Sequence, residues 1–261
     1  MIENIRCVFL HGKSGAGKTQ TARKIIPPGR ENPGVQEGSV LRMWDHEQLA
    51  APLVALHSIK TDTVGNDSDN RQLWLIDDIL GNLFPYATVP YDDLIELVYD
   101  IHAYPLVIGS NHDGQAVRDR NFMTYTADRC HELYPNIFAD YLARKIQNNY
   151  RMLEKEHPEP LVEYNVLISD LRLRPELELF KSKFSDVTVI KLEVSEDIRA
   201  NRLLERDGWA LTNEQLAHPT QSSPFTEDEF DQIVNTDTLS LTDQASMIMQ
   251  YLENPLTKAG V

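Results

Sequence analysis

The chain has 261 residues, which is enough for one α/β domain with insertions or for two small domains. Its formal net charge of −15 disfavours broad binding to nucleic acid or to anionic membranes, because both need positive surface potential. The chain has only two cysteines, which indicates buried thiols in a reducing compartment rather than a disulfide framework. The sequence contains no apolar run long enough to predict a membrane span or a signal peptide. We therefore expect a cytoplasmic protein.

The first predicted element is a short apolar strand over residues 7–10, followed by a glycine-rich turn and a helical pattern. The turn fills the motif G-x-x-x-x-G-K-[ST] with Gly12, Lys13, Ser14, Gly15, Ala16, Gly17, Lys18 and Thr19, and we name it the phosphate loop. Glycines let successive N–H groups surround an oxyanion, and a helix start adds positive charge. We therefore expect ATP phosphates here, with Lys18 on the β- and γ-phosphates and Thr19 on Mg²⁺. A chance glycine turn is the structural alternative, which the flanking strand and helix disfavour.

The middle of the chain has a mainly helical pattern. We expect a loop over 27–34, a strand over 40–44, and helices over 45–59, 71–84, 91–101 and, broken at 134–136, 119–150. Pro52 either begins or kinks the first of these helices. The helical stretch of about 45–150 predicts an insertion on the substrate side of the fold.

The last third of the chain alternates between strands and helices. Strands are predicted over 163–170, 187–194 and 232–236, and helices over 173–184, 195–206 and 241–252. Such alternation predicts a parallel sheet covered on both faces, which is a three-layer α/β/α fold. We expect one domain over 1–261, with a lid region at about 199–227.

Two charged residues follow the buried-strand pattern of residues 163–170. Asp170 is predicted at the carboxyl end of the strand, where sites in open α/β sheets gather, and it could hold Mg²⁺ through water or orient an acceptor. Arg172 could bridge the transferred phosphate. The structural alternatives are a helix N-cap for Asp170 and a surface ion pair with Glu176 for Arg172.

A basic helix face is the other local concentration of positive charge in this acidic chain. Arg199, Arg202 and Arg206 recur at helical spacing, so they could clamp ATP phosphates as a lid. A solvated face paired with neighbouring glutamates is the alternative. Arg42 and Asp45, after the second predicted strand, could meet the acceptor.

Several separated segments resemble the phage-type deoxynucleoside monophosphate kinases of the P-loop nucleoside monophosphate kinase group. The first segment, Leu49-Ala-Ala-Pro-Leu53, resembles the family pattern "A-x-P-L". Next, Arg120 to Arg129 resembles "R-x-L-Q-x-L-G-T-[DE]", and Tyr134-Pro-Asn-Ile-Phe138 resembles the "D-P-x-x-W" that follows it. Finally, Ile168 to Glu176 resembles "D-x-R-x-x-x-E", and His218 to Thr236 resembles the tail with its "D-x-[VI]-x-N" strand. The chain departs from the pattern at Tyr125-Thr126-Ala127 and at Phe138.

The resemblance implies a P-loop kinase fold and an enzyme that uses ATP and Mg²⁺ to phosphorylate a deoxynucleoside monophosphate. It places Arg120 and Arg129 near the monophosphate, and it implies the host cytoplasm if the chain is phage-encoded. One alternative keeps the chemistry but takes a hydroxyl of a modified base in DNA, which would make DNA a partner. Another is a non-catalytic NTP-binding module. The sequence leaves open which base is accepted and whether the chain forms a homodimer.

Overall fold

The computed structural model describes residues 2–26, 35–37, 40–62, 69–84, 89–107, 109–110, 116–157, 161–207 and 223–253. The chain divides into two compact units. The sheet unit comprises Met1–Gln48, Ile146–Leu204 and Ala210–Val261, and the helical unit comprises Leu49–Lys145 with Glu205–Trp209. The middle of the chain is therefore an insertion between two parts of one sheet.

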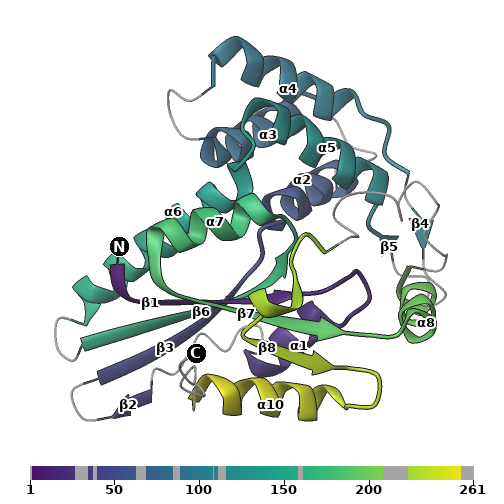
Figure 1. The fold of residues 1–261 in the computed structure, drawn as a ribbon. Coiled ribbons are helices and arrows are strands. Elements are labelled where there is room, and N and C mark those ends of the chain that lie inside the picture. The colour runs from purple at the N-terminus through teal and green to yellow at the C-terminus, as the bar shows by residue number, and fades with distance from the viewer. Residues whose placement is uncertain are drawn as a thin grey trace. The chain divides into compact units, whose positions relative to one another are not determined.

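The sheet unit is built on a six-stranded sheet in the order β2-β3-β6-β1-β7-β8 (Figure 1). Its strands are β1 Ile2–His11, β2 Val35–Glu37, β3 Val40–Glu47, β6 Leu161–Leu171, β7 Phe184–Glu193 and β8 Gln232–Asn235. Neighbouring strands run parallel, except that β2 pairs antiparallel with β3. Because β1 lies between β6 and β7, its carboxyl end and theirs share one edge of the sheet.

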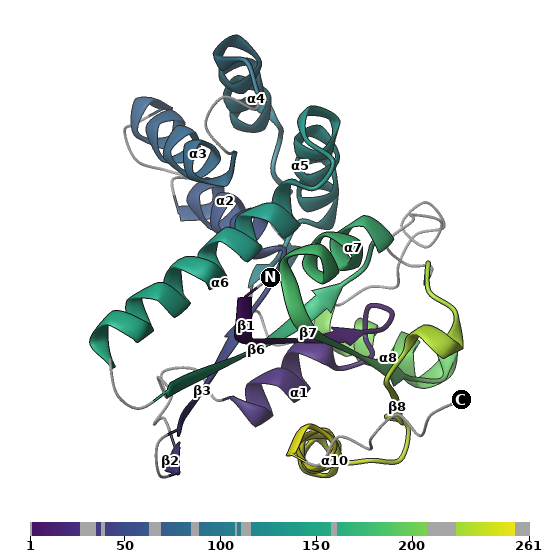
Figure 2. The ribbon, with the colours of Figure 1, turned by 60° about the vertical axis from the view of Figure 1, so that its left-hand side comes forward.

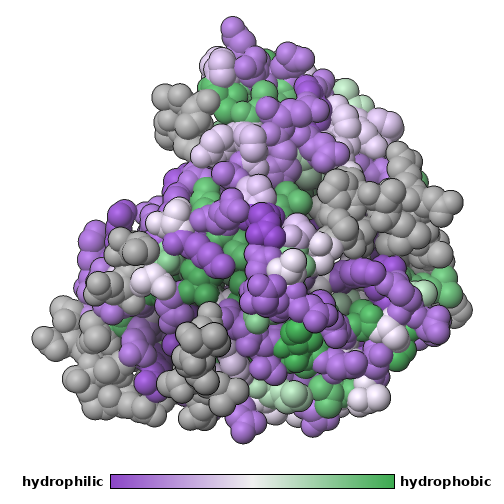
Figure 3. Space-filling model, in the orientation of Figure 1, coloured by the Kyte–Doolittle hydropathy of each residue, from purple (hydrophilic) through white to green (hydrophobic). Residues whose placement is uncertain are grey.

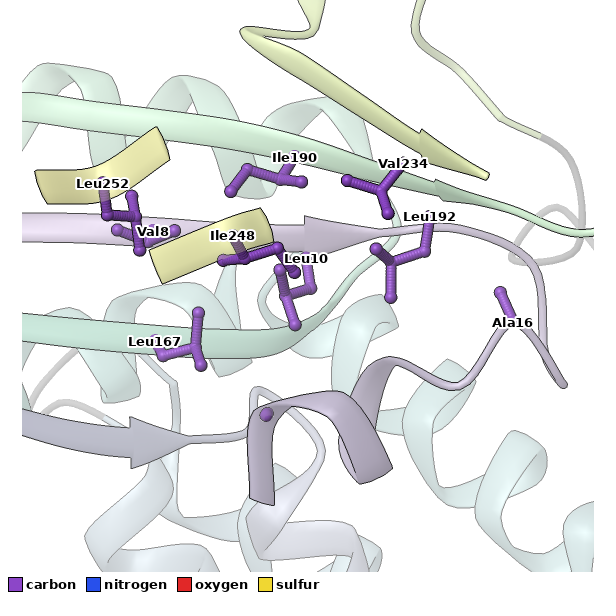
Figure 4. Packing of buried hydrophobic residues seen from close by; sticks show 10 residues of the cluster. Val8, Leu10, Ala16, Leu167, Ile190, Leu192, Val234, Ile248 and Leu252 are labelled. Atoms are coloured by element: carbon purple, nitrogen blue, oxygen red, sulfur yellow. The ribbon is translucent and has the colours of Figure 1, made fainter. Parts of the chain in front are cut away.

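Helices cover both faces of this sheet, which confirms the expected α/β fold (Figures 1 and 2). The helices of the sheet unit are α1 Lys18–Ile25, α7 Arg174–Lys183, α8 Glu196–Asp207, α10 Leu241–Glu253 and the later part of α6 Ile137–Glu156. Alternate side chains of a strand point to opposite faces. Val8 therefore packs with Ile248 of α10 in the cluster of Figure 4, whereas Phe9 meets Phe180 of α7 edge to face at 4.9 Å.

The helical unit is built from α2 Ala51–Asp62, α3 Asp69–Leu83, α4 Tyr91–Ala103 and α5 Arg120–Leu133, with the first part of α6 and a small hairpin of β4 Gly109–Ser110 and β5 Ala116–Val117. In Figure 2, α3 lies beside α4, and α2 lies beside α3 and α5. Leu56, Ile76, Leu80 and Leu97 are buried between these helices. Asp119 begins α5 by accepting two backbone N–H bonds, as N-cap residues do.

The expected helices over 71–84, 91–101 and, with its break, 119–150 are confirmed by α3, α4, α5 and α6. Two boundaries were predicted wrongly. Asp45–Glu47 belongs to β3, because these residues pair with Val166–Ile168 of β6. Phe184 begins β7 directly after α7, and β2 was not expected. The predicted loop at 27–34 and most of the lid beyond 207 lie outside the described residues.

Both cysteines are free thiols in the interior of the chain. Cys7 lies in β1 and Cys130 lies in α5, and both side chains are fully buried. Burial raises the pKa of each thiol, because the charged thiolate loses its water. Neither thiol is therefore poised for chemistry in the folded chain.

The described surface is largely polar. Figure 3 shows hydrophilic residues over most of the described surface on the face that it presents. None of the helices in the described part of the chain combines the length with the apolar composition that crossing a bilayer requires.

Candidate active site

The phosphate loop connects β1 to α1 at the carboxyl edge of the sheet. Gly12, Gly15 and Gly17 have φ angles of 148°, 90° and 89°, which side chains of L residues rarely allow. A Cβ atom on Gly12 would lie 2.6 Å from the carbonyl oxygen of Leu192, and one on Gly15 would lie 3.0 Å from Cγ of Arg199. The loop therefore needs glycine both for its turn and for its close packing against β7 and α8.

Lys18 points into this loop although it is the first residue of α1. Its side chain is buried, and its ammonium donates hydrogen bonds to the carbonyl oxygens of Gly12 and Lys13, the second at 3.1 Å. A buried ammonium needs such acceptors. The N-cap residue Gly17 provides no side-chain cap, and the first turn of α1 contains no acidic residue. Ammonium and helix terminus thus concentrate positive charge where the glycines leave room for an anion.

Polar side chains at the ends of β3 and β6, and from Gln48 directly after β3, gather next to Thr19. The Nε2 atom of Gln48 lies 3.5 Å from the hydroxyl oxygens of both Thr19 and Ser169, and His46 Nε2 lies 2.9 Å from Ser169. The next residue, Asp170, is buried near the end of β6. Burial lowers the pKa of His46, and the negative charge of Asp170 acts in the opposite direction, which makes Asp170 and His46 near neighbours.

The predicted metal residues Thr19 and Asp170 are therefore at the same sheet edge. A hydroxyl and one carboxylate suit Mg²⁺, which keeps several waters and takes further oxygens from substrate phosphates. No cluster of three or more His, Cys, Asp or Glu that could hold a metal occurs among the described residues. A metal held mainly by its own ligands and waters fits this edge, whereas an all-protein metal cage does not.

The turn after β6 carries Arg172. Its backbone N–H and that of Leu173 donate to Oε2 of Glu176 at 2.9 and 2.8 Å. Burial raises the pKa of Glu176 to about 7, and the charge of Asp170 adds to this, while the two N–H bonds act in the opposite direction. The guanidinium of Arg172 makes no hydrogen bond or ion pair with any described residue. A backbone contact to Glu176 therefore stands in place of the surface ion pair that was the structural alternative for Arg172.

His11 was missed by the sequence analysis. It ends β1, directly before Gly12, and its buried ring bonds through Nδ1 to the carbonyl of Leu171 at 3.1 Å and through Nε2 to the hydroxyl of Ser223 at 3.0 Å. Burial lowers its pKa to about 4, and the cations Lys18, Lys191 and Arg172 act in the same direction. The imidazole is therefore neutral at physiological pH. A single histidine at the end of an apolar strand matches no sequence motif, so no signal in the sequence pointed to these contacts.

The three arginines of α8 have different environments. Arg199 is buried beneath Gly15 and pairs through Nε with Glu196 at 2.7 Å, and Glu196 also binds Lys13 of the phosphate loop. The Nη1 atom of Arg199 is buried without a hydrogen-bond partner among the described residues.

Arg202 and Arg206 continue along the same helix. Arg202 donates to the carbonyl oxygen of Thr236 at 2.9 Å and to its hydroxyl at 3.2 Å, which ties α8 to the end of β8. Arg206 is exposed on the last turn of α8. The structure thus brings Arg199 to the phosphate loop, and the role of all three as a lid stays a prediction.

Arg42 and Asp45 are not brought to the phosphate loop. Arg42 pairs with Glu163 at 2.8 Å, five residues before the end of β3, which is about 16 Å along a parallel strand. The carboxylate of Asp45 accepts the hydroxyl of Tyr164 at 2.8 Å. Both side chains therefore brace β3 against β6.

Arg120 and Arg129 lie on α5 of the helical unit. Arg129 donates to Asp100 of α4 at 2.7 Å and also pairs with Glu132, and these hydrogen bonds raise its pKa. Arg120 is half-buried at the start of α5. Their expected contact with a monophosphate stays a prediction.

The chain matches no known protein-family model, and it matches none of the curated proteins. Solved structures resemble it at low identity. The APS kinase of Mycobacterium tuberculosis, in complex with AMPPNP and APS, is 12% identical with a TM-score of 0.44, over 97% of this chain and 99% of that one. The shikimate kinase of Acinetobacter baumannii, in complex with shikimate, is 14% identical with a TM-score of 0.41, over 98% of this chain and 97% of that one.

A gluconokinase of Sinorhizobium meliloti is likewise 14% identical with a TM-score of 0.41, over 99% of this chain and 100% of that one. Each of these TM-scores lies below 0.5, so the function proposed next rests on the residues of this chain.

Proposed function

We propose that this chain is an ATP- and Mg²⁺-dependent kinase that phosphorylates a deoxynucleoside 5′-monophosphate to the diphosphate. The observation that carries the proposal is the phosphate loop, in which three glycines have positive φ and the ammonium of Lys18 bonds to the carbonyls of Gly12 and Lys13, at the start of a helix whose N-cap Gly17 gives no side-chain bond. A Cβ atom at Gly12 would clash with the carbonyl oxygen of Leu192, and one at Gly15 would crowd Arg199, so glycine at both positions lets the loop turn tightly against β7 and α8.

Phosphoryl transfer needs positioned positive charge more than covalent chemistry. Lys18 supplies a cation inside the loop, and Arg172 presents a guanidinium with no partner among the described residues at the neighbouring strand end. Thr19 and Asp170 would hold Mg²⁺, which neutralises charge on the phosphates when it is bound. Arg199 adds a buried cation below Gly15.

The choice of acceptor rests on the resemblance of Asp170, Arg172 and Glu176 to the family motif. Asp170 lies near the end of β6, and Glu176 in the first turn of α7 accepts the backbone N–H of Arg172 at 2.9 Å. Arginines suit a phosphate acceptor, since a guanidinium donates two parallel bonds to phosphate oxygens. Arg120 and Arg129 are the proposed contacts to the monophosphate in the helical unit.

A coupled ADP-release assay over three classes of acceptor tests the proposal. The panel contains the deoxynucleoside monophosphates, the free deoxynucleosides, and an oligonucleotide carrying hydroxymethyluracil, each with ATP and Mg²⁺. We expect turnover with at least one monophosphate and none with the other two classes. Turnover with the oligonucleotide alone would show that the acceptor is a modified base in DNA instead of a monophosphate. Binding of ATP without turnover on any acceptor would indicate a non-catalytic module.

A further inference from the structure

Three segments that are far apart in the sequence meet at the ring of His11. The ring belongs to β1, and it contacts Leu171 at the end of β6 and Ser223, which are 160 and 212 residues away in the sequence. All three segments belong to the sheet unit. The ring directly precedes the first glycine of the phosphate loop in sequence, and it bonds to the last residue of β6, which lies between Asp170 and Arg172.

The tautomer of His11 follows from its partners. A carbonyl oxygen can only accept, so the bond to Leu171 requires a proton on Nδ1. Because the ring is neutral, Nε2 then has no proton. The hydroxyl of Ser223 has a single proton to donate, and Nε2, at 3.0 Å, is a nearer acceptor for it than the carbonyl oxygen of Phe225, at 3.2 Å. Each ring nitrogen is therefore committed to one partner.

One peptide group receives a contact at both of its polar atoms. The carbonyl of Leu171 and the N–H of Arg172 belong to the same peptide plane. His11 Nδ1 donates to that carbonyl at 3.1 Å, and Oε2 of Glu176 accepts from that N–H at 2.9 Å. This plane joins the Cα atoms of Leu171 and Arg172, so its orientation sets the backbone from which Arg172 projects and follows Asp170 by one residue.

The segment that holds Ser223 is itself firmly packed. Phe230 stacks on the ring of His11 at 5.4 Å, and Phe225 meets the ring edge to face at 5.0 Å. Arg174 donates to both carboxylate oxygens of Glu229, at 2.6 and 2.8 Å, and its guanidinium lies over Phe225. Ser223 therefore reaches His11 from an anchored position, which fixes the ring and its tautomer.

We propose that His11 and Glu176 are positioning residues that clamp the Leu171–Arg172 peptide, and that Ser223 holds His11 in the tautomer this clamp requires. This inference rests on the proposed function, because it acts through Asp170 and Arg172. The clamp fixes the backbone between these two residues and does not itself touch ATP. Its loss should therefore lower kcat while leaving the affinity for ATP nearly unchanged.

Three substitutions at His11 separate the two bonds of the ring. Asparagine places an amide N–H close to the position of Nδ1, glutamine places one close to Nε2, and phenylalanine keeps the ring without either bond. We expect His11→Gln and His11→Phe to lower kcat about 10- to 100-fold, the usual loss when an orienting partner is removed. We expect His11→Asn to stay within about threefold of the parent. The KM for ATP and the thermal shift produced by a non-hydrolysable ATP analogue should change little in all three.

The clamp is overturned if folded His11→Gln and His11→Phe keep the parental kcat, or if His11→Asn loses as much as His11→Phe. A parallel change of KM and kcat in every variant would show a general disturbance of the loop instead, and would also overturn it. Ser223→Ala provides the matched test of the tautomer, with an expected loss of kcat smaller than that of His11→Gln.

A spectroscopic measurement keeps this inference separate from the proposed function. The imidazole ¹⁵N shifts of the parent at pH 7, assigned by comparison with His11→Asn, should show a neutral His11 with its proton on Nδ1. A charged ring or a proton on Nε2 would overturn the clamp even in an active kinase. If the parent turns over no acceptor while the Nδ1 tautomer is present, the proposed function fails and the clamp geometry stands.

Discussion

Each unit of the chain contains a buried lysine whose ammonium is surrounded by backbone carbonyls. Lys18 and Lys60 are both 7% exposed, yet their settings differ. In the helical unit, Lys60 donates to the carbonyls of Ile101, His102 and Tyr104 at 3.0, 2.7 and 2.6 Å. In the sheet unit, Lys18 donates to carbonyls of the phosphate loop itself.

The partners of the two ammonium groups decide their roles. The acceptors of Lys60 lie at and just beyond the end of α4, where a helix leaves carbonyls unbonded and carries partial negative charge. Its three N–H donors are all used, so Lys60 completes a helix end. The acceptors of Lys18 lie in the turn before α1, whose N-cap residue Gly17 makes no side-chain cap bond, so an anion at this helix start can compete for the same ammonium. Burial of a lysine thus does not by itself indicate a site.

The largest expected effect is on Lys18. Methionine keeps the length of the side chain but removes its charge and its donors, so Lys18→Met should lower kcat/KM by about 10³-fold or more. Stability should change little, because the loop carbonyls can turn to water. Steady-state kinetics with thermal melts measure both, and Lys24→Met, an exposed lysine of the same helix, is the control. If kcat/KM of Lys18→Met falls by less than about tenfold, Lys18 does not serve a phosphate site and the contrast with Lys60 fails.

Lys60→Met should show the opposite pattern. Removing the ammonium leaves three carbonyls without their donor in a mostly buried place, and we expect a loss of about 3 kcal/mol in the free energy of unfolding. The specific activity of the folded fraction at low temperature should match that of the parent. Chemical denaturation followed by far-UV circular dichroism measures the loss. If stability is unchanged and activity falls, Lys60 belongs to a site and the contrast with Lys18 is wrong.

Ligand-induced stabilisation sharpens the comparison further. An ATP analogue at about 100 times its Kd should stabilise the parent by about 2.7 kcal/mol, since only the folded state binds it. We expect Lys60→Met to keep this increment on its lower baseline, and Lys18→Met to lose most of it. Thermal melts with and without the analogue and Mg²⁺ provide the measurement, and equal increments in both variants would contradict the assignment.

Glu176 gives the smallest expected effect, as an anionic counterpart of Lys60. Its folded pKa of about 7 lies above the unfolded value of 4.5, so its contribution to stability is complete below pH 4.5 and is lost as the pH rises through 7. Glu176→Gln keeps an acceptor for the two N–H groups and removes the titration. Relative to the parent, it should gain about 2 kcal/mol in stability between pH 5 and pH 8. Urea denaturation at both pH values tests this, and a constant difference would contradict the raised pKa.

Much of the fold could be predicted because its signals are local. The motif from Gly12 to Thr19, the break at 134–136 and the strand that ends near Asp170 all depend on neighbours in the sequence. Asp45–Glu47 escaped prediction because its state is decided by pairing with β6, more than a hundred residues away. The polar sequence of these residues resembles a helix start, and the sheet overrides it.

The candidate site was predictable to the same extent and for the same reason. Lys18 and Thr19 follow from a contiguous motif, and Asp170 follows from the end of a strand. His11 could not be found, since its role depends on partners 160 and 212 residues away. That Arg42 lies five residues before the end of its strand becomes visible only once β3 is seen to continue to Glu47, and its expected contact with the acceptor stays a prediction.

The two buried thiols have a practical consequence, because each unit contains one. Cys7 lies in the central strand of the sheet unit and Cys130 in a helix of the helical unit. A thiol can be alkylated only as an exposed thiolate, so each cysteine should react only when its own surroundings open. The labelling rates of the two cysteines therefore report two separate opening free energies in a chain without added probes. Measured with and without nucleotide, they would tell whether a ligand held by the sheet unit also tightens the helical one.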